Sequence, residues 1–131
     1  MAQSEIILGG LPYGADIVVG EELEVGTFTI GGTTYTRYVK VVDCGAAPNT
    51  LSSNLYYKQV DVGSNFVGLL NINGTAFAST YQIPLPMINL ANDGYSFDFY
   101  VDTSLGKIVI RTKSDVSTNY PKILAILEYY R

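Results

Sequence analysis

Residues 26–49, GTFTIGGTTYTRYVKVVDCGAAPN, decide the fold class of this chain. Gly31-Gly32 separates two runs rich in Thr, Ile, Val and Tyr, which are residues that favour strands. A two-residue hairpin turn needs positive φ at its central positions, and glycine adopts positive φ without steric cost. The stretch therefore predicts a hairpin with strands at 27–30 and 33–42, followed by a proline-containing loop at 43–54.

The remainder of the chain carries further strand signals. Eleven tyrosines, many β-branched residues and recurring Gly or Asn clusters are typical of short antiparallel strands. Further strands are expected at 55–62, 66–72, 95–101 and 107–112, with a second hairpin turn at Asn73-Gly74. Because Pro84 and Pro86 cannot donate to a ladder, the segment 82–90 predicts an edge strand or an extended connection. We predict an all-β fold, a jelly-roll-like antiparallel β-sandwich over residues 26–131, preceded by an extended N-terminal arm, residues 1–25.

The last expected strand, residues 122–130, is apolar on both faces. One face carries Ile123, Ala125, Leu127 and Tyr129, and the other carries Leu124, Ile126 and Tyr130. Such a strand lies either between two layers or against another subunit. Because a sandwich of this size buries only one face of each sheet, the pattern favours a homo-oligomer with Leu124, Ile126 and Tyr130 at the subunit interface.

Composition excludes several classes of function. The chain has 131 residues, 47% hydrophobic and 15% charged, which fits one folded domain with its own core. Its net charge of -4 and eight scattered basic residues argue against nucleic-acid binding. Every apolar run is far shorter than the roughly 20 residues that span a bilayer, and the N-terminal segment lacks the features of a signal peptide. We therefore expect no nucleic-acid partner and no membrane insertion.

The residues that usually carry catalysis are scarce. The chain has no histidine, which removes the commonest general base and most zinc and copper sites. The single cysteine, Cys44, is expected to be a small buried residue. Asp98 and Asp102 share one strand face without an opposing carboxylate, and we interpret Glu21, Glu22 and Glu24 as surface charge. We predict no catalytic residue, no metal and no cofactor, and hence no enzyme.

Two acidic or glycine-rich segments resemble ligand loops only superficially. In the segment 89–94, the spacing of an EF-hand fails, and an Asx turn at Asn92-Asp93-Gly94 accounts for the sequence. The segment 9–14 is rich in glycine but lacks the lysine of a phosphate-binding loop, and it is interpreted as part of the extended arm.

Tyrosine is the remaining functional signal. Tyrosines among Asn, Asp and Thr could form a flat surface for sugar rings or for a protein partner, because the side chain combines apolar area with a hydrogen-bonding tip. Alternatively, tyrosine simply fills half-exposed sheet positions, for which it has high propensity. The candidate glycan or partner contacts are Tyr56, Tyr57, Tyr100, Pro48 and Asn49.

A series of short motifs runs along the chain from Glu21 to its last strand. They are Glu21-Glu22, Val25-Gly26, Phe28-Thr29-Ile30, Gly31-Gly32, Tyr35-Thr36-Arg37-Tyr38, Gly45-Ala46-Ala47-Pro48-Asn49, Ile83-Pro84-Leu85-Pro86, Phe99-Tyr100-Val101-Asp102, Ile108-Val109-Ile110-Arg111-Thr112 and Leu127-Glu128-Tyr129-Tyr130. Together they resemble a β-sandwich domain of tailed-bacteriophage virion proteins, often the C-terminal module of tail-fibre, baseplate or head-fibre proteins. The resemblance covers residues 21–131, but Phe28 replaces a usual tryptophan, and Tyr56-Tyr57-Lys58 replaces a usual histidine-glycine step.

The resemblance implies a trimeric, non-enzymatic virion component, made in the host cytoplasm, that meets host surface glycans. The family assigns no catalytic residues, so none is transferred to this chain. The short segment ahead of the domain favours a capsid decoration, head-fibre or baseplate piece whose N-terminal arm contacts another virion protein. A tail-fibre head remains an alternative within the family, and a carbohydrate-binding module that uses the tyrosines is an alternative outside it.

Overall fold

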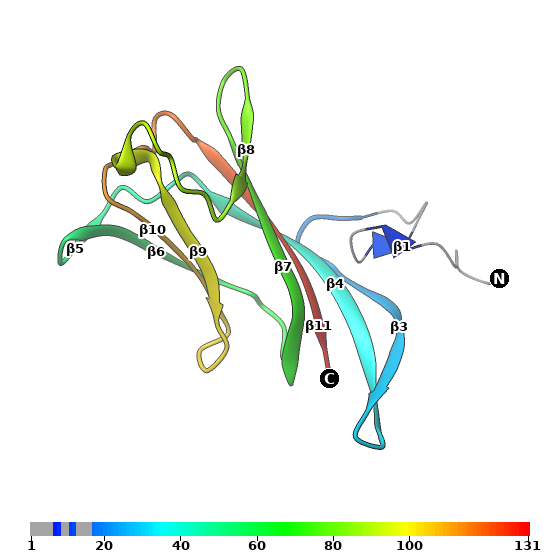
Figure 1. Ribbon diagram of the computed structural model, residues 1–131. Helices are drawn as coiled ribbons and strands as arrows, with labels where there is room; N and C mark the ends of the chain where they lie inside the picture. The colour runs from blue at the N-terminus through cyan, green and yellow to red at the C-terminus, as the bar shows by residue number, and fades with distance from the viewer. Residues whose placement is uncertain (1–6, 9–10, 13–16) are drawn as a thin grey trace.

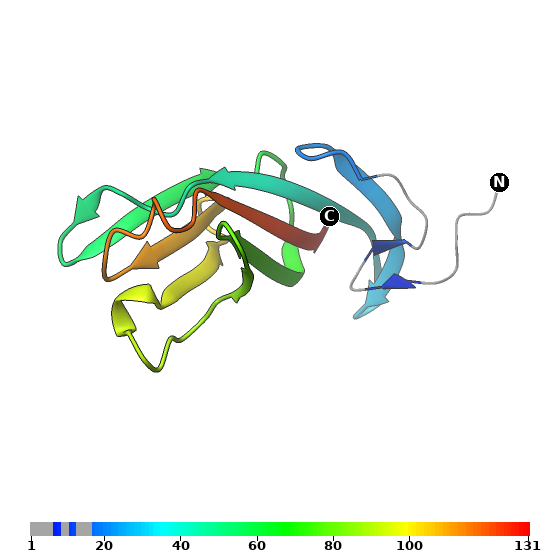
Figure 2. The same ribbon diagram turned by 90° about the horizontal axis from the view of Figure 1, so that it is seen from above.

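A computed structural model describes residues 7–8, 11–12 and 17–131 of the chain. Within these ranges the regular elements are β-strands, apart from one three-residue 3-10 turn, Asp93–Tyr95. Two antiparallel sheets pack together as a sandwich (Figures 1 and 2). The predicted all-β antiparallel sandwich is confirmed.

The larger sheet has five strands in the order β3-β4-β11-β7-β8. Their bounds are β3 (Glu22–Ile30), β4 (Thr33–Gly45), β11 (Lys122–Tyr130), β7 (Gly68–Phe77) and β8 (Gln82–Leu85). The smaller sheet has the order β5-β6-β10-β9, with β5 (Leu51–Ser52), β6 (Leu55–Asp61), β10 (Lys107–Thr112) and β9 (Phe97–Asp102). Two further short strands, β1 (Ile7–Leu8) and β2 (Leu11–Pro12), pair with each other.

The hairpin between β3 and β4 forms as predicted. Gly31 and Gly32 have φ of 58° and 81°, so both central turn positions use the left-handed region that favours glycine. The pairing extends farther back than expected, because Glu22 already pairs with Lys40. The sheet therefore begins inside the segment that the sequence assigned to the N-terminal arm.

The expected loop after this hairpin is shorter than predicted. Strand β4 continues to Gly45, where the backbone N–H donates to Asp43 Oδ1 at 2.9 Å. Residues 51–52 then form the short strand β5, which pairs with the start of β6. The loop around Pro48 and Asn49 is thus held between two paired segments.

The predicted turn at Asn73-Gly74 is wrong, because both residues lie inside β7. Gly74 is paired on both sides, with Ala125 of β11 and Leu85 of β8. A Cβ atom at Gly74 would lie 2.7 Å from Cζ of Phe99 in the opposite sheet. This glycine therefore lets an aromatic ring approach the strand, and no turn is needed to explain it.

Strand β8 is an edge strand of the five-stranded sheet, which is one of the two alternatives predicted for residues 82–90 from Pro84 and Pro86. The hairpin of β9 and β10 also forms. Phe97 and Phe99 of β9 and Ile108 and Ile110 of β10 are buried on the same face, which is turned to the core. Tyr95 was expected in this strand but lies in the preceding 3-10 turn. The expected Asx turn there is confirmed, since Gly94 N–H donates to Asn92 Oδ1 at 3.1 Å.

The core lies between the central strands of the two sheets. In β11, the side chains of Ile123, Ala125, Leu127 and Tyr129 are all fully buried at 0% exposure, as their face predicted. Cys44 is 3% exposed, and burial raises the pKa of its thiol to about 11. It is therefore the small buried residue expected from the sequence.

Candidate functional site

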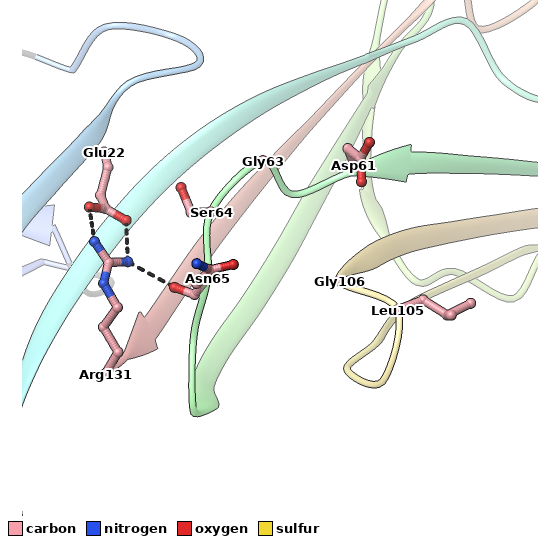
Figure 3. Close-up of a pocket in the computed structure, with 8 residues that line it drawn as sticks. All are labelled: Glu22, Asp61, Gly63, Ser64, Asn65, Leu105, Gly106 and Arg131. Carbon is pink, nitrogen blue, oxygen red and sulfur yellow. Dashed lines mark hydrogen bonds and ion pairs between the residues drawn. The ribbon is translucent and has the colours of Figure 1, made fainter.

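A pocket with a volume of about 590 Å³ lies at one end of the sandwich. Glu22 and Arg131 line one side of it, Asp61, Leu105 and Gly106 lie across from them, and residues 63–65 connect the two sides (Figure 3). The walls come from the start of β3, the end of β6, the β9–β10 turn and the residue after β11. We call this the end pocket.

Glu22 is tied to the chain segment at the end of β11. Arg131 donates from Nη1 to Oε1 of Glu22 at 2.8 Å and from Nη2 to Oε2 at 2.7 Å. The Tyr129 hydroxyl donates to the same Oε1 at 2.5 Å, and Arg131 Nη1 also donates to the Asn65 carbonyl at 2.8 Å. Glu22 is thus part of a built network, and its interpretation as simple surface charge is wrong.

The hydrogen bonds and charges of this network determine the protonation states of Glu22 and Tyr129. The hydrogen bond from Arg131, assisted by that from Tyr129, holds the pKa of Glu22 below its ordinary value. Burial, together with the hydrogen bond to Glu22, raises the pKa of Tyr129 to about 12. At neutral pH the carboxylate is therefore ionised and the phenol neutral, so Glu22 is not a proton donor for acid catalysis.

The expected interface residues Leu124, Ile126 and Tyr130 lie on the outer face of the five-stranded sheet, away from the core. Leu124 and Ile126 are half-buried on β11, between β4 and β7. Tyr130 lies over Gly68 and packs edge-on against Phe28 and Tyr35, with both centroid distances at 4.9 Å. Tyr130 is therefore engaged within the chain, whereas the two aliphatic side chains are not covered by the second sheet.

Charged residues accompany these aliphatic side chains on the outer face. Arg37 donates from Nε and Nη2 to Oε2 of Glu128 at 2.8 and 2.6 Å. On the β4 side, Val39 and Val41 are buried at 1% and 8% exposure. The accessible part of this face is thus centred on β11 and β7, where Asn71 and Asn73 are exposed.

The candidate tyrosines separate onto two faces of the smaller sheet. Tyr57 pairs with Arg111, and Tyr100 pairs with Val109, which lies two residues from Arg111 along β10 and on the same outer face. The guanidinium carbon of Arg111 lies 5.5 Å from the Tyr100 ring centroid. Tyr56, by contrast, shares its face with the buried Thr112, so it does not join the other two.

The loop residues among the candidates form a separate small pocket. Pro48 and Asn49 line a cavity of about 180 Å³ together with Tyr57 and Lys58. Lys58 Nζ donates to the Ala46 carbonyl at 2.7 Å, which fixes the loop against β6. Tyr57 is therefore the one candidate that joins the loop to the outer face of the smaller sheet.

Asp98 and Asp102, which share one strand in the sequence analysis, each bind a neighbouring side chain. Asp98 accepts from Arg111 Nη2 at 2.7 Å, and Asp102 accepts from the Ser104 hydroxyl at 2.6 Å. Among the described residues, no group of three or more His, Cys, Asp or Glu side chains converges on a possible metal position. Within the same residues, no helix has the length and apolar character to cross a membrane.

None of the protein-family models, curated proteins or solved structures compared with this chain matches it. Function is therefore inferred from the residues and geometry of the chain itself.

Proposed function

We propose that this chain is a non-enzymatic structural protein of a bacteriophage virion that assembles as a homotrimer through the outer face of its five-stranded sheet. It would serve as a capsid decoration, head-fibre or baseplate component, with its N-terminal arm contacting another virion protein. The phage assignment rests on the series of motifs from Glu21 to Tyr130. Much of the arm, residues 1–25, lies outside the described residues, so its role remains part of the proposal.

One observation supports the proposed assembly into a trimer. Strand β11 is the central strand of the larger sheet, yet Leu124 and Ile126 on its outer face remain accessible after the sandwich has formed. They are flanked on β7 by Asn71 and Asn73. A small apolar centre bordered by polar residues on one side is compatible with a subunit interface, which has an apolar centre and a polar rim.

The test is to replace Ile126 with aspartate. In a trimer, Ile126→Asp would bury an unpaired carboxylate in each interface, so the variant should be monomeric. Multi-angle light scattering should give about three times the chain mass of 14.3 kDa for the wild-type protein and the chain mass for the variant. A wild-type monomer, or a variant that remains trimeric, would overturn the interface.

A matched control places the same charge on the other sheet. Gln59 is exposed and lies on β6 in the outer face of the four-stranded sheet. Gln59→Asp should leave the mass unchanged. Mass spectrometry of purified virions tests the location independently, because a virion protein must be present in the particles at a fixed stoichiometry.

Carbohydrate binding is the second candidate, and one observation favours it. Tyr57 and Tyr100 share the outer face of the smaller sheet with Arg111 and Asp98, which places aromatic surface beside hydrogen-bonding groups. Such a combination suits the stacking of a sugar ring. A glycan array probed with the purified chain tests this candidate, and failure to bind any glycan there would remove it.

A further inference from the structure

Lys40 is a buried cation beside the end pocket. It lies on β4 opposite Leu127, on the face that is turned to the core, and is only 7% exposed. Its ammonium donates to the Ser64 hydroxyl at 3.0 Å. Among the described residues, no carboxylate lies within ion-pair distance of it.

Three acidic residues lie near Lys40, and each of them binds another group. Asp43, which lines the same cavity as Lys40, accepts from the backbone N–H of Gly45. Glu22 pairs with Lys40 in the strand register, but its two oxygens accept from Arg131. Asp61 binds Lys107 at 3.1 Å. Because a buried ammonium without a paired anion is costly, Lys40 is a candidate to bind the carboxylate of a ligand.

Space for an anion lies beside this ammonium. Ser64 lines the end pocket, and Lys40 itself lines an adjoining cavity of about 440 Å³ that shares Asp61 and Gly63 with it. A Cβ atom at Gly63 would lie 3.0 Å from Lys40 Nζ. The backbone therefore passes close to the ammonium without a side chain to fill the space.

The lining of the two cavities indicates the class of ligand. Asn65 and the exposed Asp61 can hydrogen-bond to hydroxyl groups, while Val42, Val60 and Val62 supply apolar wall in the adjoining cavity. Glu22 and Asp61 also place negative charge here, which disfavours a dianion such as phosphate. A monoanion with several hydroxyl groups fits this combination, and a volume of about 590 Å³ accommodates one sugar ring.

We propose that the cavity beside Lys40 and the adjoining end pocket together bind a hydroxylated carboxylate of the sugar-acid class, whose carboxylate pairs with Lys40 and Ser64 while its hydroxyl groups contact Asn65 and Asp61. This site is independent of the outer face through which the chain assembles. If no sugar acid binds, the proposed trimer is not affected, because ligand binding and molecular mass are measured in separate experiments.

Isothermal titration with D-glucuronate and D-glucose tests the proposal, since the two sugars differ at one carbon, a carboxylate against a hydroxymethyl group. Glucuronate should bind at least about tenfold more tightly than glucose, as expected for a charge-assisted hydrogen bond. Lys40→Met keeps the length of the side chain and removes its charge, and should abolish this preference. Lys122→Met, at an exposed position at the start of β11, is the matched control and should bind like the wild type.

A second variant keeps the test decisive if Lys40→Met does not fold. Asn65→Asp changes only one side chain of the pocket loop and introduces a carboxylate at the ligand position, so it should weaken glucuronate binding by at least about tenfold. Equal affinity for the two sugars, or unchanged glucuronate binding in Asn65→Asp, would overturn the proposal. So would inorganic phosphate that competes with glucuronate at equal concentration, because it would reveal a site for anions in general.

Discussion

Glu22 joins two strands that are not neighbours in the sheet. It lies at the start of β3, whereas Tyr129 and Arg131 lie at the end of β11, and β4 runs between these strands. The Arg131 guanidinium also lies over the ring of Tyr38 on β4, with 4.1 Å between Cζ and the ring centroid. One carboxylate thus holds three strands together at the end pocket.

Removal of this charge should make the protein less stable at neutral pH. Glu22→Gln keeps the shape of the side chain but loses charge-assisted hydrogen bonds, at a cost of about 1–2 kcal/mol in the free energy of unfolding, because the pair is partly exposed. Urea denaturation at pH 7 measures this cost. Glu21→Gln, at the exposed neighbouring position, should change little.

The same contact predicts a pH dependence. The pKa of Glu22 is lowered in the folded protein, so the unfolded chain binds a proton more readily. The stability contributed by Glu22 is therefore present above its ordinary pKa of 4.5 and is lost as the pH falls through the lowered value. The difference in unfolding free energy between wild type and Glu22→Gln should shrink with acidification, and a constant difference down to about pH 3 would contradict this assignment.

At the scale of elements, Gly74 determines how closely the two sheets approach. Its added Cβ would lie 2.7 Å from Phe99 Cζ and 3.1 Å from Leu85 Cβ. Gly74→Ala should therefore destabilise the fold by about 1–3 kcal/mol through overpacking. Denaturant titration measures this loss, and Phe99→Leu in the same chain should recover part of it if the ring is the cause.

Gly74 also shows where sequence patterns succeed and fail. The pair Gly31-Gly32 was predicted correctly because a tight turn needs only local backbone conformation. Asn73-Gly74 carries a similar local signal, but its glycine is required by a ring from the other sheet, and single-sequence patterns do not contain that contact. The bounds of strand β11 were predicted correctly because apolar residues alternate on both of its faces along the sequence.

The end pocket was missed for the same reason. Its residues are far apart in the sequence and come together only in the folded protein, where β3, β6 and β11 are brought close to one another. They include Glu22, Asp61, Ser64 and Arg131. Lys40 gave no signal of its burial, because a lysine that alternates with Val39 and Val41 in a strand is expected on the exposed face.

At the scale of the whole molecule, the two sheets differ in extent. The tip of the β3–β4 hairpin projects beyond the four-stranded sheet (Figure 1), so the larger sheet offers surface that its partner sheet does not cover. A long sheet with an accessible apolar centre at Leu124 and Ile126 is suited to pack against copies of itself. The proposed assembly through this face would couple the stability of each chain to its concentration.

That coupling gives a thermodynamic test that is independent of molecular mass. If unfolding releases three chains, mass action requires the melting temperature to rise with total protein concentration. The melting temperature of the wild type, followed by circular dichroism over about a hundredfold range of concentration, should increase steadily. Ile126→Asp should melt at a lower temperature that does not depend on concentration, because its unfolding is unimolecular. A wild-type melting temperature that stays constant over this range would show that the outer face of β11 contributes no subunit contact.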